Sequence, residues 1–202
     1  MAFSLFRAVP AILFFASLAS CTRTLRICNY YAPLVFLSWD IKLNAYLPPD
    51  RALAQNGCLM ETFLPTWSGA LYAGLAPNGR DALDPEWRIY DTKVEFTFDG
   101  YDGLDYFDVD LEHGVSVPVM IYAGDAAGGC GVDKLPDCPA ALQRVNKDGR
   151  IVQCRRLAAE VPEYFRKGCP DMYVTANDGA QGTKVGTSQL EYIDVVIGVK
   201  MD

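Results

Sequence analysis

An alternation of apolar and acidic residues makes residues 105–118 the most informative stretch of the chain. Three apolar side chains alternate with three carboxylates: Phe107, Val109 and Leu111 with Asp108, Asp110 and Glu112. This two-residue period is typical of a half-buried β-strand, so the carboxylates are expected to share one face. Such a face can be plain surface solvation or a site, depending on what the fold places beside it.

Residues 93–98 alternate in the same way, and two Asp-Gly pairs in residues 99–103 predict a hairpin that joins the two strands. If the apolar residues share one face, Glu95 lies opposite Asp108 and Lys93 opposite Asp110. The Cβ atoms of Glu95 and Asp108 are then roughly 5 Å apart. Like charges this close predict a raised pKa for one carboxyl group, which favours a site over a solvated surface.

The remaining pattern predicts further strands on both sides of a loop-rich middle. The expected strands are residues 25–39 with a break near Pro33, 58–73 around Pro65, 115–122 and 190–199. Residues 124–131 are expected to form a flexible loop, and residues 140–145 and 155–167 helical structure, with a second short helix opening at Pro162. The helix-containing subregion is therefore placed at about residues 124–178.

Length and charge narrow the class of protein. A chain of 202 residues suits one domain, here residues 22–202. Its net charge of −7 and single histidine argue against nucleic acid as a partner, because no basic stripe is available to neutralise phosphates. The composition fits a protein that acts outside the cell on neutral or cationic material, and we expect a monomer.

Residues 1–20 have the pattern of a signal peptide, with Arg7 before an apolar run and small residues for cleavage near positions 19–21. No apolar run is long enough to span a bilayer. Residues 18–21 also match a bacterial lipobox, so lipid anchoring through Cys21 is a minor alternative to free secretion. Apart from Cys21, six cysteines remain, and an even number in an exported chain implies three disulfides, with fifteen possible pairings.

Several segments resemble, in order and spacing, motifs of the thaumatin-like (osmotin) family. They are residues 94–98 (VEFTF), 105–109 (DYFDV), 114–120 (GVSVPVM), 128–130 (GGC), 138–142 (CPAAL), 164–173 (YFRKGCPDMY) and 176–178 (AND). The resemblance covers residues 93–178 well and residues 58–90 hardly at all. It implies an all-β fold, a thaumatin-like β-sandwich with a small disulfide-tied loop and helix region, in a compact version with few disulfides.

The resemblance also implies an acidic cleft and a disulfide pattern. Glu95, Asp108 and Asp178 match acidic residues of the family's cleft. His113 stands where the family has another aspartate, and the cleft arginine has no secure match, with Arg88 as a guess. The implied disulfides are Cys28–Cys58, Cys130–Cys169 and Cys138–Cys154.

Other side chains near the expected cleft have two interpretations each. Tyr106, Tyr101 and Tyr173 can stack on sugar rings or simply pack at the rim. His113 can contribute to binding or be an exposed turn residue. A calcium site formed by Asp108, Asp110 and Asp178 is disfavoured because strand spacing does not make a converging loop, and the chain has no zinc-binding pattern. We expect no metal and no cofactor.

The implied function is that of a secreted defence or antifungal protein that binds cell-wall polysaccharide, β-1,3-glucan, through the acidic cleft. One alternative is a weak endo-β-1,3-glucanase, a glycoside hydrolase with Glu95 as the acid and Asp108 as its partner. Because His113 replaces an aspartate, we favour binding over catalysis. The other alternative is a secreted effector or inhibitor that binds a protein partner.

Overall fold

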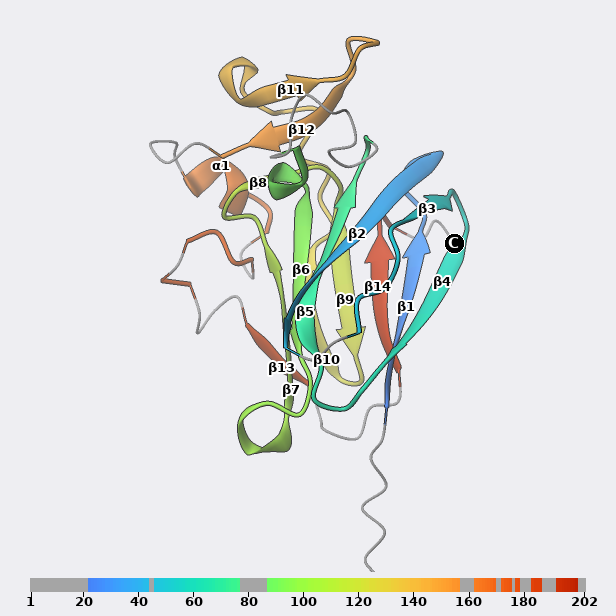
Figure 1. The fold of residues 1–202 in the computed structure, drawn as a ribbon. Coiled ribbons are helices and arrows are strands. Elements are labelled where there is room, and N and C mark those ends of the chain that lie inside the picture. Colours follow the sequence, from blue (N-terminus) through green and yellow to red (C-terminus); the bar gives the residue numbers. More distant parts are fainter. Residues whose placement is uncertain are drawn as a thin grey trace, which may run out of the picture.

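Two β-sheets packed face to face form the body of the protein, and a smaller sheet with a short helix lies at one end of them (Figure 1). The computed structural model describes residues 22–43, 46–76, 87–156, 162–169, 172–175, 177–178, 183–186 and 192–199. The predicted signal peptide and Cys21 lie outside these ranges. Within them, no helix combines the length and apolar character of a membrane span.

The first large sheet has five strands, with β14 and β1 parallel and the other neighbours antiparallel. Their order is β10 (Ala126–Cys130), β9 (Val119–Ala123), β14 (Tyr192–Ile197), β1 (Arg23–Asn29) and β4 (Cys58–Phe63). The predicted strand at residues 190–199 is thus confirmed over residues 192–197, where it fills the centre of this sheet.

The second large sheet has six strands, all paired antiparallel. Their order is β13 (Lys184–Gly186), β7 (Asp105–Asp110), β6 (Thr92–Thr97), β5 (Ser68–Gly74), β2 (Leu34–Leu43) and β3 (Arg51–Ala54). The two sequence breaks predicted near Pro33 and Pro65 separate β1 from β2 and β4 from β5.

The end region contains a three-stranded sheet of β11 (Gln143–Val145), β12 (Ile151–Arg155) and β8 (Gly114–Val115), together with the helix α1 (Pro162–Arg166). Figure 1 shows them above the sandwich. Short 3-10 turns occur at η1 (Trp87–Tyr90), η2 (Tyr101–Gly103) and η3 (Ala140–Leu142).

Three expectations for the middle of the chain need correction. Residues 124–131, predicted as a flexible loop, contain the edge strand β10. Its glycines hide it in the sequence, yet they are required: Gly129 has a φ of 123°, and a Cβ there would lie 2.4 Å from the carbonyl oxygen of Val119. The helix-containing region therefore begins after β10 rather than at residue 124.

The predicted helices are also shorter than expected. Helix α1 begins at Pro162 as predicted, but Arg155 ends the strand β12, and residues 157–161 lie outside the described ranges. Of residues 140–145, only the first three form a 3-10 turn, and the rest form β11. Cross-strand pairing with β12 overrides the local helical preference here.

The core lies between the inner faces of the two large sheets. On β6 and β7 the apolar positions of the alternating pattern, Val94, Phe96, Phe107 and Val109, are each at most 1% exposed. An aromatic cluster of Trp39, Phe63, Trp67 and Phe98 packs beside them. Each such side chain contributes roughly 1.5–3 kcal/mol through burial, which fixes the register of the hairpin and hence the outward direction of its polar residues.

Covalent and ionic links fasten the periphery to this core. The three disulfides join the pairs implied by the resemblance, Cys28–Cys58, Cys130–Cys169 and Cys138–Cys154. Asp105, which is fully buried, accepts a hydrogen bond from Arg23 Nε on β1 at 2.6 Å and another from the Asp99 backbone N–H. The first carboxylate of the acidic stretch thus ties the two large sheets together and has a structural role.

Candidate functional site

The outer face of β6 and β7 carries the polar half of the alternating pattern. The observed register pairs Glu95 with Asp108 and Lys93 with Asp110, as predicted, and Thr97 with Tyr106. The two carboxylates therefore lie side by side on neighbouring strands and face away from the apolar core.

Two lysines form ion pairs with carboxylates on this face, Glu95 and Asp110. Lys93 Nζ lies 3.0 Å from Asp110 Oδ2 and 3.0 Å from Glu95 Oε1. Lys42, from β2, donates a second hydrogen bond to the same Glu95 oxygen. Charges alternate across the face in the order Lys42, Glu95, Lys93, Asp110, and these four sum to zero.

Asp108 lies next to this chain of charges without a comparable partner. Its Oδ1 is buried and lacks a hydrogen-bond partner within the part of the chain that the structure describes. Burial, and after it the negative charges of Glu95 and Asp110, raise the pKa of Asp108 to about 7. Asp108 thus holds its proton in mildly acidic solution and can donate a hydrogen bond.

Glu95 behaves in the opposite way. Burial alone would raise the pKa of Glu95, but the hydrogen bonds and charges of Lys42 and Lys93 outweigh burial and lower it. One raised pKa in the pair was predicted, but the choice of Glu95 as the better acid is wrong. The cause is Lys42, which reaches Glu95 from a strand 53 residues away in sequence, at a register shift between β2 and β5.

Tyr173 approaches this pair from the end region. Its backbone forms a parallel bridge to Asp110, accepts from the Leu111 N–H at 2.7 Å and donates to the Val109 carbonyl at 3.1 Å. Burial, followed by the charges of Asp108, Glu112, Asp110 and Asp178, raises the pKa of the Tyr173 phenol. The phenol therefore lies within electrostatic reach of the predicted acidic residues.

Tyr106 lies two residues from Asp108 on the same face of β7 and is half-buried. Its hydroxyl donates to the Tyr101 carbonyl at 3.1 Å, which holds the ring beside the η2 turn. Tyr101 itself is 79% exposed. The structure thus leaves the Tyr106 ring partly accessible two residues from Asp108 and the Tyr101 ring exposed at the η2 turn, and sugar stacking on them stays a prediction.

Asp178 is engaged in local structure. Both of its oxygens accept from Arg166 NH2, at 2.6 and 2.7 Å, and Oδ2 also accepts from the backbone N–H groups of Val174 and Thr175. Although burial opposes ionisation, these bonds lower the pKa of Asp178 to about 2. Through these contacts Asp178 connects the segment around Tyr173 to α1. Its expected part in ligand binding stays a prediction.

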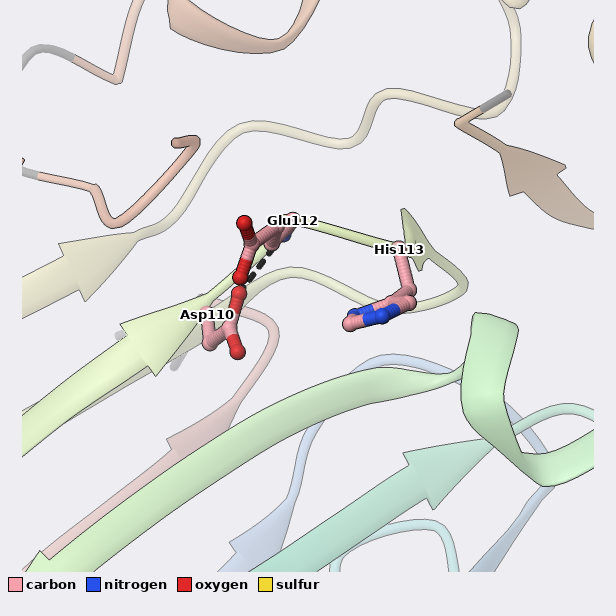
Figure 2. Close-up of side chains that lie close together, drawn as sticks. All are labelled: Asp110, Glu112 and His113. Atoms are coloured by element: carbon pink, nitrogen blue, oxygen red, sulfur yellow. Dashed lines mark hydrogen bonds between the residues drawn. The ribbon is translucent and has the colours of Figure 1, made fainter. Parts of the chain in front are cut away.

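His113 is exposed and immediately precedes β8, with its backbone carbonyl accepting from the Arg156 N–H. Figure 2 shows it beside Asp110 and Glu112, and one possible metal-ligating atom from each lies within 4.8 Å of the others. However, Asp110 Oδ2 is bound by Lys93, and Oδ1 accepts from the Glu112 N–H at 2.6 Å. With both oxygens engaged and an ammonium group adjacent, the cluster is better suited to holding the loop than a cation.

Arg88, the guess for the cleft arginine, lies one strand further across the same sheet. Its guanidinium stacks 4.8 Å from the Tyr72 ring centroid and donates to the Trp39 carbonyl at 3.2 Å. Tyr72 pairs with Lys93 across β5 and β6. Arg88 thus flanks the charged face, while lysines rather than an arginine neutralise Glu95.

The sequence pattern did not indicate two charged partners of the predicted site residues, Lys42 and Arg166. Each bonds to a predicted site residue, but neither follows from the β6–β7 hairpin pattern. Lys42 is brought in by β2 and Arg166 by α1, so only the assembled fold places them.

Comparisons with known proteins agree with this architecture. The model of the thaumatin family matches residues 86–163. A glucan endo-1,3-beta-glucosidase from Prunus avium is 27% identical over 163 residues, which cover 66% of this chain and 64% of the relative. Thaumatin-like protein 1b from Malus domestica is 27% identical over 146 residues, which cover 59% of this chain and 66% of the relative.

Among solved structures, the protein elicitor MoHrip2 from Magnaporthe oryzae covers 88% of this chain and 99% of its own, with a TM-score of 0.45 and 8% sequence identity. The chain spans less than two thirds of the length of the two curated relatives. Taken with the family model and the motifs along β6, β7 and the end region, these relatives show that the chain is similar to thaumatin-like proteins.

Proposed function

We propose that this protein binds a neutral cell-wall polysaccharide of the β-1,3-glucan class on the outer face of β6 and β7. The observation that carries the proposal is the Glu95–Asp108 pair, two adjacent carboxyl groups whose pKa values shift in opposite directions. Below pH 7, Asp108 donates and Glu95 accepts hydrogen bonds. Sugar hydroxyls, which do both, match such a pair.

The charge balance of the face supports a neutral ligand. Lys42 and Lys93 offset Glu95 and Asp110, so a charged polymer gains little there despite the net charge of −7 on the whole chain. Tyr106, two residues from Asp108 on the same face of β7, offers apolar ring surface near the pair, as carbohydrate sites require. The name of the Prunus avium relative adds a β-1,3-glucan connection.

The direct test is sedimentation of the purified mature protein with insoluble β-1,3-glucan at pH 5.5. We expect the wild type to sediment and Glu95→Gln with Asp108→Asn to weaken binding about tenfold, roughly 1.4 kcal/mol, because the variant loses the charged acceptor and the acid donor. The matched control is Asp125→Asn with Glu163→Gln, which makes the same change at two exposed positions on the molecule. A wild-type protein that stays in the supernatant would overturn the proposal.

A second candidate, weak endo-β-1,3-glucanase activity, is favoured by the same pair. Two carboxyl groups with divergent pKa values are the minimum equipment of a glycoside hydrolase. Here Asp108 is the acid, and Glu95 is the base or nucleophile. Two ammonium groups on Glu95 reduce its basicity, so we rank catalysis below binding. Release of reducing ends from a soluble β-1,3-glucan, abolished by Asp108→Asn and by Glu95→Gln, would establish the enzyme.

We further propose that the protein is secreted and has a defence or antifungal role. The signal-peptide pattern of residues 1–20 and three disulfides are typical of an oxidising compartment outside the cytosol. Immunodetection of the protein in the medium of a native culture tests secretion, and detection in the membrane fraction would instead favour lipid anchoring through Cys21. The alternative of a secreted effector requires a protein partner, and none of the contacts in the described residues favours this alternative.

A further inference from the structure

The outer face of the five-stranded sheet, on the far side of the sandwich, carries exposed aromatic and apolar side chains. Tyr192 on β14 is 50% exposed, Tyr122 on β9 is 45% exposed, and Met60 on β4 is 55% exposed. In Figure 1 these strands lie side by side with β1 between β14 and β4. Side chains of this size are normally covered in a monomer when they gather on one face.

A salt bridge stands in the middle of this face. Arg26 Nε and NH2 donate to the two oxygens of Asp194 at 2.6 and 2.7 Å, a bidentate arrangement between β1 and β14. The side chains are 53% and 31% exposed, so the pair offers polar atoms to solvent. The hydrogen bonds and charge of Asp194 raise the pKa of Arg26, so Arg26 stays charged.

The register places these residues in one row across the sheet. Met60 pairs with Arg26, Arg26 with Asp194, and Asp194 with Tyr122. At about 4.8 Å per strand, the row is roughly 14 Å long. Tyr192 lies two residues before Asp194 on the same face of β14. It is therefore a diagonal neighbour of Tyr122, roughly 7–8 Å away.

A hollow of about 390 Å³ opens in this face, lined by Arg26, Met60, Tyr192 and Asp194. This volume falls in the range of small-ligand sites, about 300–1,000 Å³. Its wall combines one ring, one thioether and a neutral pair of opposite charges that both donates and accepts hydrogen bonds. Neither an anion nor a cation is favoured by such a wall, whereas a neutral polyhydroxylated ligand is.

We propose that this tyrosine face, defined by Arg26, Met60, Tyr122, Tyr192 and Asp194, is a second binding surface for a neutral polysaccharide chain. The rings of Tyr122 and Tyr192 pack on sugar rings, and the Arg26–Asp194 pair bonds hydroxyl groups in the hollow. The identity of the polymer, β-1,3-glucan, rests on the proposed function, while the surface itself rests on these separate residues. The Arg26–Asp194 pair lies in the row between Met60 and Tyr122, so polar atoms interrupt the exposed apolar side chains, which favours a hydroxyl-rich ligand.

The position of the two surfaces has a consequence. They lie on opposite outer faces of the sandwich, so a short stretch of glucan cannot contact both at once. The second surface therefore adds little avidity to a single chain, but it allows one protein molecule to hold two chains together.

The test uses light scattering from a soluble, long-chain β-1,3-glucan mixed with the full-length mature protein. The wild type is expected to raise the scattering at least tenfold through cross-linking. Tyr122→Ala with Tyr192→Ala is expected to abolish this rise while retaining at least a third of the binding in sedimentation. Tyr122→Phe with Tyr192→Phe keeps the rings and is the matched control, expected to cross-link like the wild type.

The outcomes separate the two surfaces. Unchanged cross-linking by the Tyr-to-Ala variant would overturn the tyrosine face and leave the Glu95–Asp108 site in place. Full loss of binding by that variant, with normal binding by Glu95→Gln/Asp108→Asn, would overturn the Glu95–Asp108 site alone. The mass of the wild type without glucan must be that of a monomer, because cross-linking by a dimer with one site per subunit would also overturn the inference.

Discussion

On the outer face of β6 and β7, four charged side chains of alternating sign lie beside Asp108, whereas on the opposite outer face the Arg26–Asp194 pair lies among exposed tyrosines. Both faces are close to neutral, but they differ in burial. The Lys93 and Asp110 side chains are 20% and 3% exposed, while those of Arg26 and Asp194 are 53% and 31% exposed.

This difference in burial separates ion pairs that stabilise the fold from an ion pair that a ligand can reach. A buried ion pair leaves a costly unpaired charge when one partner is removed, and an exposed pair leaves a solvated one. The ion pairs of the charged face are therefore structural. The carboxyl group of Asp108 can still gain or lose a proton near pH 7. The tyrosine face is held by its sheet alone, and its polar atoms are open to a ligand.

Among the variants considered, Lys93→Met is expected to change the free energy of unfolding most. The substitution leaves Asp110 buried without its ammonium partner and brings Glu95 and Asp110 into unscreened repulsion. We expect a loss of about 3 kcal/mol in the free energy of unfolding at pH 7, at the lower end for a buried pair because Lys93 is 20% exposed. Urea unfolding followed by fluorescence measures it.

The matched comparison is Lys42→Met, which removes the other ammonium group on Glu95. The Lys42 side chain is 60% exposed, so the loss should stay below about 1 kcal/mol. If both variants lose the same free energy of unfolding, burial does not decide how much each lysine contributes to stability.

Asp108→Asn should have the next largest effect, and of opposite sign. The pKa of Asp108 rises from 3.8 to about 7 on folding, so the folded state binds a proton more tightly than the unfolded chain. The free energy of unfolding therefore falls as the pH rises from about 4 to about 7 and is level above that. A shift of this size corresponds to roughly 4 kcal/mol, and we expect about 2 kcal/mol of stabilisation at pH 8 because Asp108 keeps some solvent contact.

Asp91 supplies the control. It is 1% exposed, accepts from Gln153 Nε2 at 2.6 Å, and burial raises its pKa to about 7 as well. Asp91→Asn should stabilise the protein at pH 8 by a similar amount but leave glucan binding unchanged. Thermal unfolding across pH 4 to 8 tests both variants. If Asp108→Asn is no more stable than the wild type at pH 8, the proton is not held by this carboxyl group.

Much of the charged face could be predicted from sequence because a hairpin is a local structure. The alternation of residues 93–98 and 105–110 and the Asp-Gly turn between them set the register, and so the pairs Glu95–Asp108 and Lys93–Asp110. The assignment of the proton could not be predicted, because Lys42 arrives from β2, two strands away in the sheet, at a register shift that no local pattern indicates.

The tyrosine face shows the same limit more strongly. Arg26 and Asp194 are 168 residues apart in the chain, and only the parallel pairing of β1 with β14 brings them together. The alternation in residues 190–199 predicted a strand but not its neighbour. Likewise, the glycines of residues 126–130 indicated a loop, because the close approach to Val119 that requires them exists only in the folded sheet.

The pH dependence of glucan binding should distinguish the faces by about tenfold, or 1.4 kcal/mol. Asp108 loses its donated proton as the pH passes about 7, so binding through the charged face weakens between pH 5.5 and 8.5. Arg26 keeps its charge throughout this range because its pKa is raised, so we expect binding through the tyrosine face to be constant. Sedimentation at both pH values with the Tyr122→Ala/Tyr192→Ala variant measures the first face alone, and a flat profile in that variant would contradict the role of Asp108.

The smallest effect is expected from Arg26→Met. The salt bridge with Asp194 is exposed and neighbouring strand pairs hold β1 in place on both sides, so the free energy of unfolding should fall by less than about 1 kcal/mol. Met keeps the length of the side chain over the hollow but removes its donors. Cross-linking of soluble glucan should therefore drop severalfold at nearly unchanged stability, in contrast to Lys93→Met. A loss of stability as large as that of Lys93→Met would mean that the Arg26–Asp194 pair is part of the framework, like the lysine network on the other side, and is not open to a ligand.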